Sequence, residues 1–264
     1  MSENDNDPGR VRALLEGAHD EGALSAASMQ VLTVADLGAQ IQAGLGVSVD
    51  DVEASEVVLV TLMPDDSGSI RFAGNADAVR AGQNLVLDAL SGSRQQGEVL
   101  VHTRYLNGHV LHPYCPLSSA VRMDASNYDP SLGTPLYDQS VVLLGTVLAK
   151  AQELADHGVP CRTVTLLITD GADAGSVRAT AADVATLVRD MQRAECHVVA
   201  AMGIDDGTTD HRAVFRSMGI EDRWILTPKN SDREIRRAFQ VFSQSAVQAS
   251  QASALGNLGG FLGP

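Results

Sequence analysis

The stretch VVLVTLMPDDSGSI, residues 57–70, joins a strongly apolar run to a polar loop. Residues 57–63 are rich in valine and carry no charge, which is typical of a β-strand buried on both faces. Pro64 lacks the N–H that a central strand needs, so we expect the strand to end at or before it. The aspartates and serines that follow form either a polar turn or a site that uses their oxygen atoms.

Strand and helix patterns alternate from residue 55 onward, and Asn107-Gly108 is a strong signal for a β-hairpin. This alternation predicts an α/β, Rossmann-like fold, with a mainly parallel central sheet, one antiparallel edge strand and helices on both faces. Further strands are expected over 98–106, 109–114, 161–170, 196–204 and 222–228. Helices are expected over 76–90, 136–158, 176–195 and 231–246.

Composition divides the chain into three parts. Residues 1–54 are rich in Ala and Gly with weak helical periodicity, and we interpret them as an N-terminal helical extension. Residues 55–245 form the α/β domain. Residues 246–264 comprise the end of the last helix and a Gly-rich tail, whose Phe261 and Leu262 are expected to fray rather than dock.

The charge balance limits the classes of partner. The chain has 33 acidic and 19 basic residues, a formal net charge of −14. Such a balance argues against binding to nucleic acid and to anionic membrane surfaces. The polar start MSENDNDPGR does not resemble a signal peptide, and no apolar run reaches the roughly 18 residues of a membrane span. Three cysteines without metal-ligand spacing are expected to be buried free thiols, which favours a cytoplasmic protein.

The polar loop carries the spacing of a metal site. Asp65, Ser67 and Ser69 are two residues apart, so a tight loop can turn their oxygens toward one point, as a hard divalent cation requires. Hydroxyls are weak ligands, and further oxygens are therefore needed. Thr134 in SLGTPLYD (131–138) and Asp170 in TLLITDGAD (165–173) follow at the same predicted sheet edge. There Gly133 and Gly171 are expected to supply turns, and Pro135 a helix start.

The segments LMPDDSGSI, GTPLYD and LLITDGAD together resemble the metal-ion-dependent adhesion site (MIDAS) of von Willebrand factor A (vWA) domains. The resemblance covers about residues 55–245. It implies a Mg²⁺ or Mn²⁺ ion that Ser67 and Ser69 bind directly and that Thr134, Asp65 and Asp170 bind directly or through water. It also implies a partner protein that supplies an Asp or Glu to the metal, and no catalytic residues.

Residues around the motif receive weaker assignments. Pro64 departs from the aliphatic residue that the family usually has before its first aspartate. Asp66 is expected to point to solvent, and Asp173 to be a solvated loop carboxylate. Asp124, Tyr128 and Asp129 lie in the segment leading to Thr134, where they can shape the rim of the site.

Three alternatives compete with the binding module. A zinc site could use His102, His109, His112 and Cys115, but residues three apart on a strand face opposite ways, and half-exposed strand histidines are preferred. A metal-dependent phosphohydrolase would need a second carboxylate where Ser67 stands, and no histidine base or phosphate-binding loop is present. The third alternative is a structural vWA domain with a vestigial metal site.

The resemblance extends to a class of intracellular protein. The segment FQVFSQSAVQASQ (239–251) is similar to bacterial vWA proteins of the tellurite-resistance type. Such proteins, like those paired with AAA+ ATPases, act as adaptor or assembly subunits. We therefore predict a cytoplasmic, non-enzymatic adaptor. Its expected partner is an AAA+ ATPase or another complex subunit.

Overall fold

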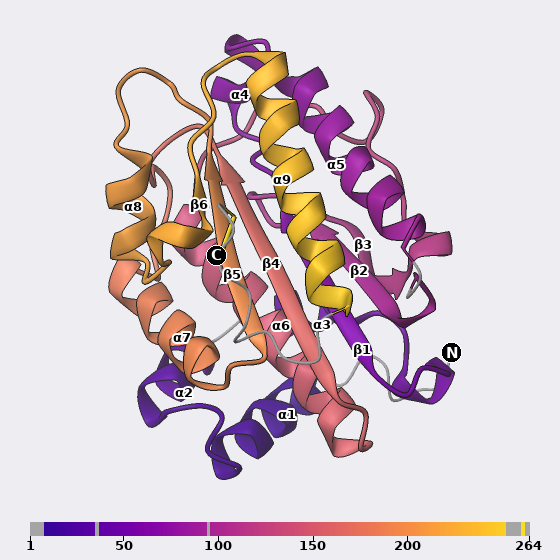
Figure 1. The fold of residues 1–264 in the computed structure, drawn as a ribbon. Coiled ribbons are helices and arrows are strands. Elements are labelled where there is room, and N and C mark those ends of the chain that lie inside the picture. The colour runs from indigo at the N-terminus through magenta and orange to yellow at the C-terminus, as the bar shows by residue number, and fades with distance from the viewer. Residues whose placement is uncertain (1–7, 35–36, 94–95, 252–259, 262–264) are drawn as a thin grey trace.

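A computed structural model describes residues 8–34, 37–93, 96–251 and 260–261 of the chain (Figure 1). Its strands are β1 (Val57–Met63), β2 (Val99–Arg104), β3 (Val110–Pro116), β4 (Cys161–Thr169), β5 (His197–Gly203) and β6 (Ile225–Leu226). Its α-helices are α1 (Pro8–Asp20), α2 (Ala26–Leu32), α3 (Leu37–Leu45), α4 (Gly68–Phe72), α5 (Ala76–Ser91), α6 (Leu136–Asp156), α7 (Ala181–Arg193), α8 (His211–Ser217) and α9 (Asp232–Gln251). Short 3₁₀ turns lie at Val49–Asp51, Gln96–Glu98, Leu117–Ser119 and Asp222–Trp224.

The strands form one sheet in the order β3-β2-β1-β4-β5-β6. β1 occupies the middle and pairs in parallel with β2 on one side and β4 on the other. β3 pairs antiparallel with β2 through the turn at Asn107-Gly108, which confirms the predicted hairpin and edge strand. β1 is buried at every position and ends at Met63, as Pro64 predicted. The predicted α/β, Rossmann-like fold is therefore confirmed.

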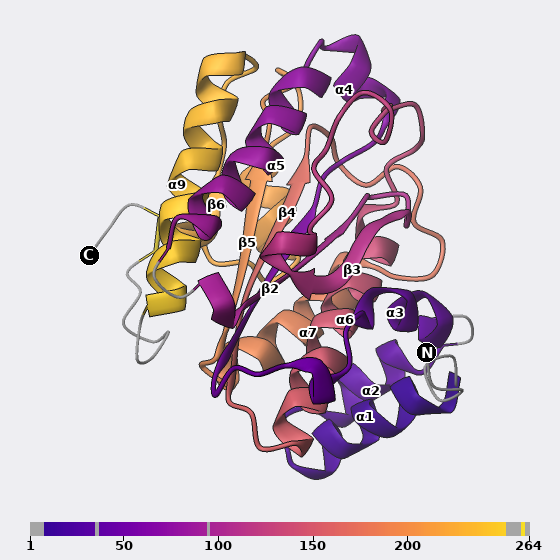
Figure 2. The same cartoon turned by 90° about the vertical axis from the view of Figure 1, so that its right-hand side faces the viewer.

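Helices cover both faces of the sheet (Figures 1 and 2). α5 and α9 pack against each other on one face, and α6 and α7 lie on the other. The first pair is unusually close, because a Cβ placed on Gly82 of α5 would lie 2.0 Å from the ring of Phe239 in α9. Glycine at this position thus sets the separation of the two helices.

The N-terminal helices form a further layer outside α6 and α7 (Figure 2). Ile41 and Leu32 contact α6 at Gly145, where an added Cβ would meet both side chains within 3 Å. Lys150 of α6 is fully buried beneath this layer and donates to the carbonyl of Val47 and to Glu153. Its hydrogen bond to Val47 connects the segment before β1 to the central helix α6. The predicted boundaries of the extension at 1–54 stay a prediction.

In the C-terminal part, α9 ends at Gln251, within the segment 246–264 that was expected to contain the end of the last helix. Phe261 does not fray: its ring packs edge-on against Trp224 with centroids 5.3 Å apart, and its N–H donates to the carbonyl of Arg223. An aromatic ring gains more by covering Trp224 than by remaining in water. Leu262 lies outside the described residues. Among the described helices, none has the length and apolarity that crossing a membrane requires.

Candidate metal centre

Asp65 lies at the centre of the candidate site, immediately beyond the end of β1. Its side chain is fully buried. One carboxylate oxygen accepts from the N–H of Ser67 at 2.7 Å, and the other accepts from the hydroxyl of Thr169 at 2.7 Å. Since Thr169 ends β4, these bonds connect the loops that follow two neighbouring strands. The carboxylate therefore holds the two loops together at the carboxyl edge of the sheet.

The sequence predicted that Ser67 and Ser69 lie in a single loop, but the structure places them at the start of a short helix. Ser67 is the N-cap of the five-residue helix α4, and Ser69 lies in its first turn. The hydroxyl oxygens of the two serines are 2.9 Å apart, and Ser69 donates to Asp170 at 2.6 Å. The short helix thus brings three of the predicted ligand oxygens into one hydrogen-bonded row. This row crosses from β1 to β4.

Thr134 reaches the site through its backbone. The carbonyl of the preceding Leu132 accepts from Gly68 at 3.0 Å, and the carbonyl of Thr134 accepts from Ala174 at 3.0 Å. The segment of Thr134 therefore lies between the loop of Ser67 and the loop that follows Asp170. Thr134 is 9% exposed, and within the described residues its hydroxyl makes no hydrogen bond, which leaves the oxygen available to a ligand.

Gly171 lies in a bend, as expected, whereas Gly133 lies in irregular backbone. Gly133 and Gly171 do not adopt positive φ, unlike several other glycines of the chain. Gly133 instead offers its carbonyl to Asn107, and the N–H of Gly171 donates to the hydroxyl of Thr169. Pro135 precedes α6 directly, as the sequence predicted. Hydrogen bonds between side chains and the backbone, rather than left-handed turns, shape these loops.

Electrostatics favour a cation at this place. Burial raises the pKa of Asp65 to about 6, against hydrogen bonds from Ser67 and Thr169 that lower it, and the charge of Asp170 adds to the rise. Burial likewise raises the pKa of Asp170, and Asp206 adds to that effect. No Arg, Lys or His in the described part of the chain forms an ion pair with either carboxylate. A divalent cation would relieve this repulsion.

Asp66 does not point to solvent. Its side chain is only 5% exposed and accepts from the backbone and side-chain N–H groups of Asn107. Its own carbonyl accepts from Ser131 and Leu132. Asp66 therefore ties the hairpin turn and the segment of Thr134 to the metal loop. The prediction failed because nothing local in the sequence shows that Asn107 would lie opposite.

Three further residues support the site. Tyr128 donates its buried hydroxyl to the carbonyl of Asp65. Asp173 is half-buried and accepts from the N–H of Tyr137, so it caps the start of α6 instead of being merely solvated. Asp206, which the sequence analysis missed, follows β5; although burial opposes the effect, hydrogen bonds from Thr208 and Thr209 hold its pKa well below the usual range. Its position after the next strand of the alternation could have revealed it.

The histidines around the hairpin were expected to be half-exposed, but the structure differs. His102 and His112 are buried, and the Nδ1 of His102 lies 2.8 Å from the carbonyl of His112. Burial lowers the pKa of His102 to about 3, so it is neutral at physiological pH. In the ranges that the structure describes, no group of three or more His, Cys, Asp and Glu side chains is placed to hold a metal. The cysteines are free but only partly buried.

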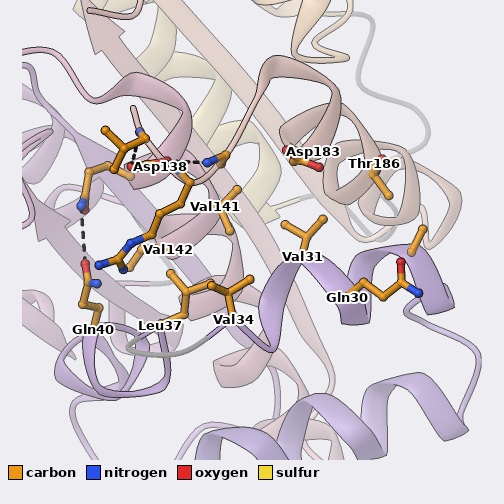
Figure 3. Close-up of a pocket in the computed structure, with 15 residues that line it drawn as sticks. Gln30, Val31, Val34, Leu37, Gln40, Asp138, Val141, Val142, Asp183 and Thr186 are labelled. Atoms are coloured by element: carbon orange, nitrogen blue, oxygen red, sulfur yellow. Dashed lines mark hydrogen bonds between the residues drawn. The ribbon is translucent and has the colours of Figure 1, made fainter. Parts of the chain in front are cut away.

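A groove of about 450 Å³ lies between the N-terminal helices, the start of α6 and α7 (Figure 3). Asp138, in the first turn of α6, accepts from the N–H groups of Val177, Arg178 and Ala179 and thereby forms one wall. Val31, Val34 and Leu37 line the opposite wall (Figure 3). The groove therefore borders the loop that follows Asp170.

Comparisons with known proteins identify the fold. No protein-family model matches the sequence, and no curated protein matches it. Solved structures do match: the vWF domain of the type V pili tip protein Mfa5 from Porphyromonas gingivalis is 12% identical with a TM-score of 0.51, over 76% of this chain and 98% of that one. The chain has the vWA fold.

A second match is a pilus adhesin. SpaC from Lactobacillus rhamnosus GG, in its open conformation, is 16% identical with a TM-score of 0.51, over 74% of this chain. The chain spans only 30% of the length of that adhesin. At this level of identity both matches show the vWA fold alone.

The oxygen set at the sheet edge fits the ion that the vWA fold implies. It comprises two carboxylates whose burial raises their pKa and two serine hydroxyls within hydrogen-bond distance of one another or of Asp170. The free hydroxyl of Thr134 lies on the adjoining segment. All-oxygen sets of this kind suit hard cations such as Mg²⁺ and Mn²⁺.

Proposed function

We propose that this chain is a divalent-metal-dependent protein-binding module. Asp65, Ser67, Ser69, Thr134 and Asp170 would hold Mg²⁺ or Mn²⁺, and an Asp or Glu of a partner protein would complete the site. The observation that carries the proposal is the row of oxygens from Ser67 through Ser69 to Asp170, in which no basic side chain of the described residues forms an ion pair with Asp170. A bound cation would attract a partner carboxylate strongly.

Asp65 and Thr134 would have different roles in this site. The hydrogen bonds of Asp65 to Ser67 and Thr169 hold two strand-end loops in a fixed relation, so the ligand oxygens are preorganised. Thr134 precedes α6 by only one residue, Pro135. Movement of Thr134 toward an ion would therefore be transmitted to the start of the central helix.

A non-enzymatic role is favoured by the same geometry. No histidine of the described chain makes a hydrogen bond to Ser67 or Ser69, whereas hydrolysis with a serine nucleophile requires a base within that reach. Asp65 has both carboxylate oxygens engaged by Ser67 and Thr169, which makes it a poor nucleophile. A phosphohydrolase remains the competing class for the experiment below.

The biological setting is proposed from the sequence resemblance. The acidic composition and the similarity of residues 239–251 to the tellurite-resistance type support a cytoplasmic adaptor or assembly subunit. An AAA+ ATPase or another complex subunit would be its partner. Nucleic acid is not expected to bind, because the net charge of −14 repels the phosphate backbone.

Affinity capture with the full chain separates these functions. Proteins are captured from source lysate with Mg²⁺ or with EDTA, using wild type and Ser69→Ala, and each captured partner is then scanned by replacing its acidic residues. The proposal predicts one partner that is lost with EDTA, with Ser69→Ala and with one Asp or Glu change. A partner set that is the same in all conditions would indicate a vestigial site. Turnover of p-nitrophenyl phosphate that requires Mg²⁺ and Asp65 would indicate a hydrolase.

A further inference from the structure

An exposed basic cluster lies at the beginning of α9, comprising Lys229, Arg233, Arg236 and Arg237. The three arginines are spaced three and four residues apart, so they share one face of the helix. Arg233, Arg236 and Arg237 line a common surface hollow with Asp232 and Gln240. We call these four basic residues the α9 cluster.

The cluster is unusual because none of its side chains forms an ion pair with another described residue. Most other basic side chains of the described chain form ion pairs, as Arg122 does with Asp88 and Arg216 does with Asp222. Arg189 and the four members of the cluster are the exposed basic side chains that form no ion pair and no side-chain hydrogen bond with any other described residue. Asp232 and Glu234 stand within the same stretch, which leaves a net charge of +2 from four basic and two acidic residues.

The α9 cluster lies at the same end of the molecule as the candidate metal centre. α9 follows β6 after a short loop, and the carbonyl of Pro228 in this loop accepts from Asp205, which follows β5. The neighbouring Asp206 is close enough to Asp170 to raise its pKa, after the larger effect of burial. Figure 1 shows α4 and the first turn of α9 at this same end.

We propose that the α9 cluster is a second contact for the partner of the metal site, and that it binds an acidic segment of that partner protein. The inference rests on the proposed function in that one partner engages both contacts. A net charge of −14 repels an acidic protein at most of the surface, whereas a cation and unpaired arginines at one end attract it there. The same arrangement would orient the partner and select against basic proteins.

The geometry favours a carboxylate-rich protein over nucleic acid. Asp232 and Glu234 interrupt the cluster, and Asp205 lies next to Pro228 in the loop that leads to it. A continuous phosphate backbone would meet these carboxylates at close spacing. A protein segment can place its acidic residues selectively against the arginines.

The test uses the full chain and a fluorescent peptide of alternating Glu and Ser at low salt. Arg233→Ala/Arg237→Ala is compared with Arg12→Ala/Arg189→Ala, which removes the same charge from α1 and α7 on the other side of the sheet. With EDTA present, we expect the α9 variant to bind the peptide about tenfold more weakly than wild type, and the control variant to match wild type. Circular dichroism should show both variants folded, since alanine suits exposed helix positions.

The remaining arms keep this inference separate from the metal proposal. Adding Mn²⁺ should tighten peptide binding in wild type but not in Ser69→Ala, while both keep their dependence on Arg233 and Arg237. Absence of the Mn²⁺ effect alone would refute the metal proposal and leave the cluster intact. Equal affinities for the α9 and control variants would overturn the inference. So would tighter, cluster-dependent binding of single-stranded DNA, or self-association at low salt that requires the same two arginines.

Discussion

At the scale of single residues, the fully buried carboxyl of Asp65 governs the behaviour of the metal-free site. Its pKa is raised from 3.8 to about 6 by burial. The folded state therefore binds the proton more tightly than the unfolded chain does. The stability contributed by this group is complete below pH 3.8 and is lost as the pH rises through about 6.

Asp65→Asn should reveal this titration. Unfolding free energies are measured by urea denaturation without divalent ions. When the pH is lowered from roughly 7 to 4, wild type should gain about 2 kcal/mol in unfolding free energy relative to the variant. Other titrating groups are common to both proteins and cancel in the difference. A difference that is constant over this range would show that Asp65 is not desolvated as the structure has it.

Tyr128 offers a second test at this scale, because its hydroxyl donates to the carbonyl of Asp65. Tyr128→Phe leaves that buried carbonyl unsatisfied, so we expect a loss of about 1–3 kcal/mol in unfolding free energy and weaker Mn²⁺ binding. Tyr137→Phe is the matched control, since its hydroxyl makes no hydrogen bond to other described residues. Equal effects of the two substitutions would contradict the role given to Tyr128.

Positions set by strand order could be predicted from the sequence, whereas positions set by long-range polar contacts could not. Ser67, Ser69 and Asp170 were brought together by strand order, which follows from the periodicity of Val-rich runs. Asp66 was misplaced because its burial depends on Asn107, which lies 41 residues away. Tyr128 depends likewise on its contact with Asp65, which lies 63 residues away. Long-range pairing of polar side chains leaves little trace in local sequence.

At the scale of elements, the contact between α5 and α9 is set by Gly82. Gly82→Ala would place a methyl group 2.0 Å from Phe239. We expect a loss of about 1–3 kcal/mol in unfolding free energy, despite the better helix propensity of alanine. Gly92→Ala, where the nearest atom would lie at 3.6 Å, should cause no comparable loss. Thermal denaturation of both variants measures the contrast, and a stabilised Gly82→Ala protein would contradict the packing.

The buried elements could be predicted from the sequence, whereas the short helices α4 and α8 could not. β1 and β4 are continuous apolar runs, and the Asn107-Gly108 turn defined the hairpin. α4 is only five residues long and has too few positions for a helical period to be recognised. Ser67 stands at its N-cap position without a side-chain capping hydrogen bond, and it is this helix that brings Ser69 to Asp170.

At the scale of the whole molecule, Lys150 joins the N-terminal helices to the vWA fold. Its ammonium group is buried with Val47 and Glu153, and Arg10 of α1 also pairs with Glu153. Burial lowers the pKa of Lys150, against the charge of Glu153. Lys150→Met should therefore lower the unfolding free energy by about 3 kcal/mol, because it leaves the carbonyl of Val47 unpaired.

The control for Lys150 is the exposed pair of Arg12 and Glu16 in α1. Arg12→Ala should change stability little, because water screens exposed charges. Urea denaturation of both variants tests whether the N-terminal helices are an integral layer of the fold. If Lys150→Met unfolds like wild type, the connection between this layer and α6 contributes nothing to stability.

The central claim is that one divalent cation binds at the carboxyl edge of the sheet. Calorimetric titration of the full chain with Mn²⁺ tests it most directly, using wild type, Ser67→Ala/Ser69→Ala and the control Ser126→Ala/Ser217→Ala. We predict one ion per chain for wild type and for the control, and loss of binding in the Ser67/Ser69 variant. Mn²⁺ binding that is equal in all three proteins, or absent from wild type, would contradict it.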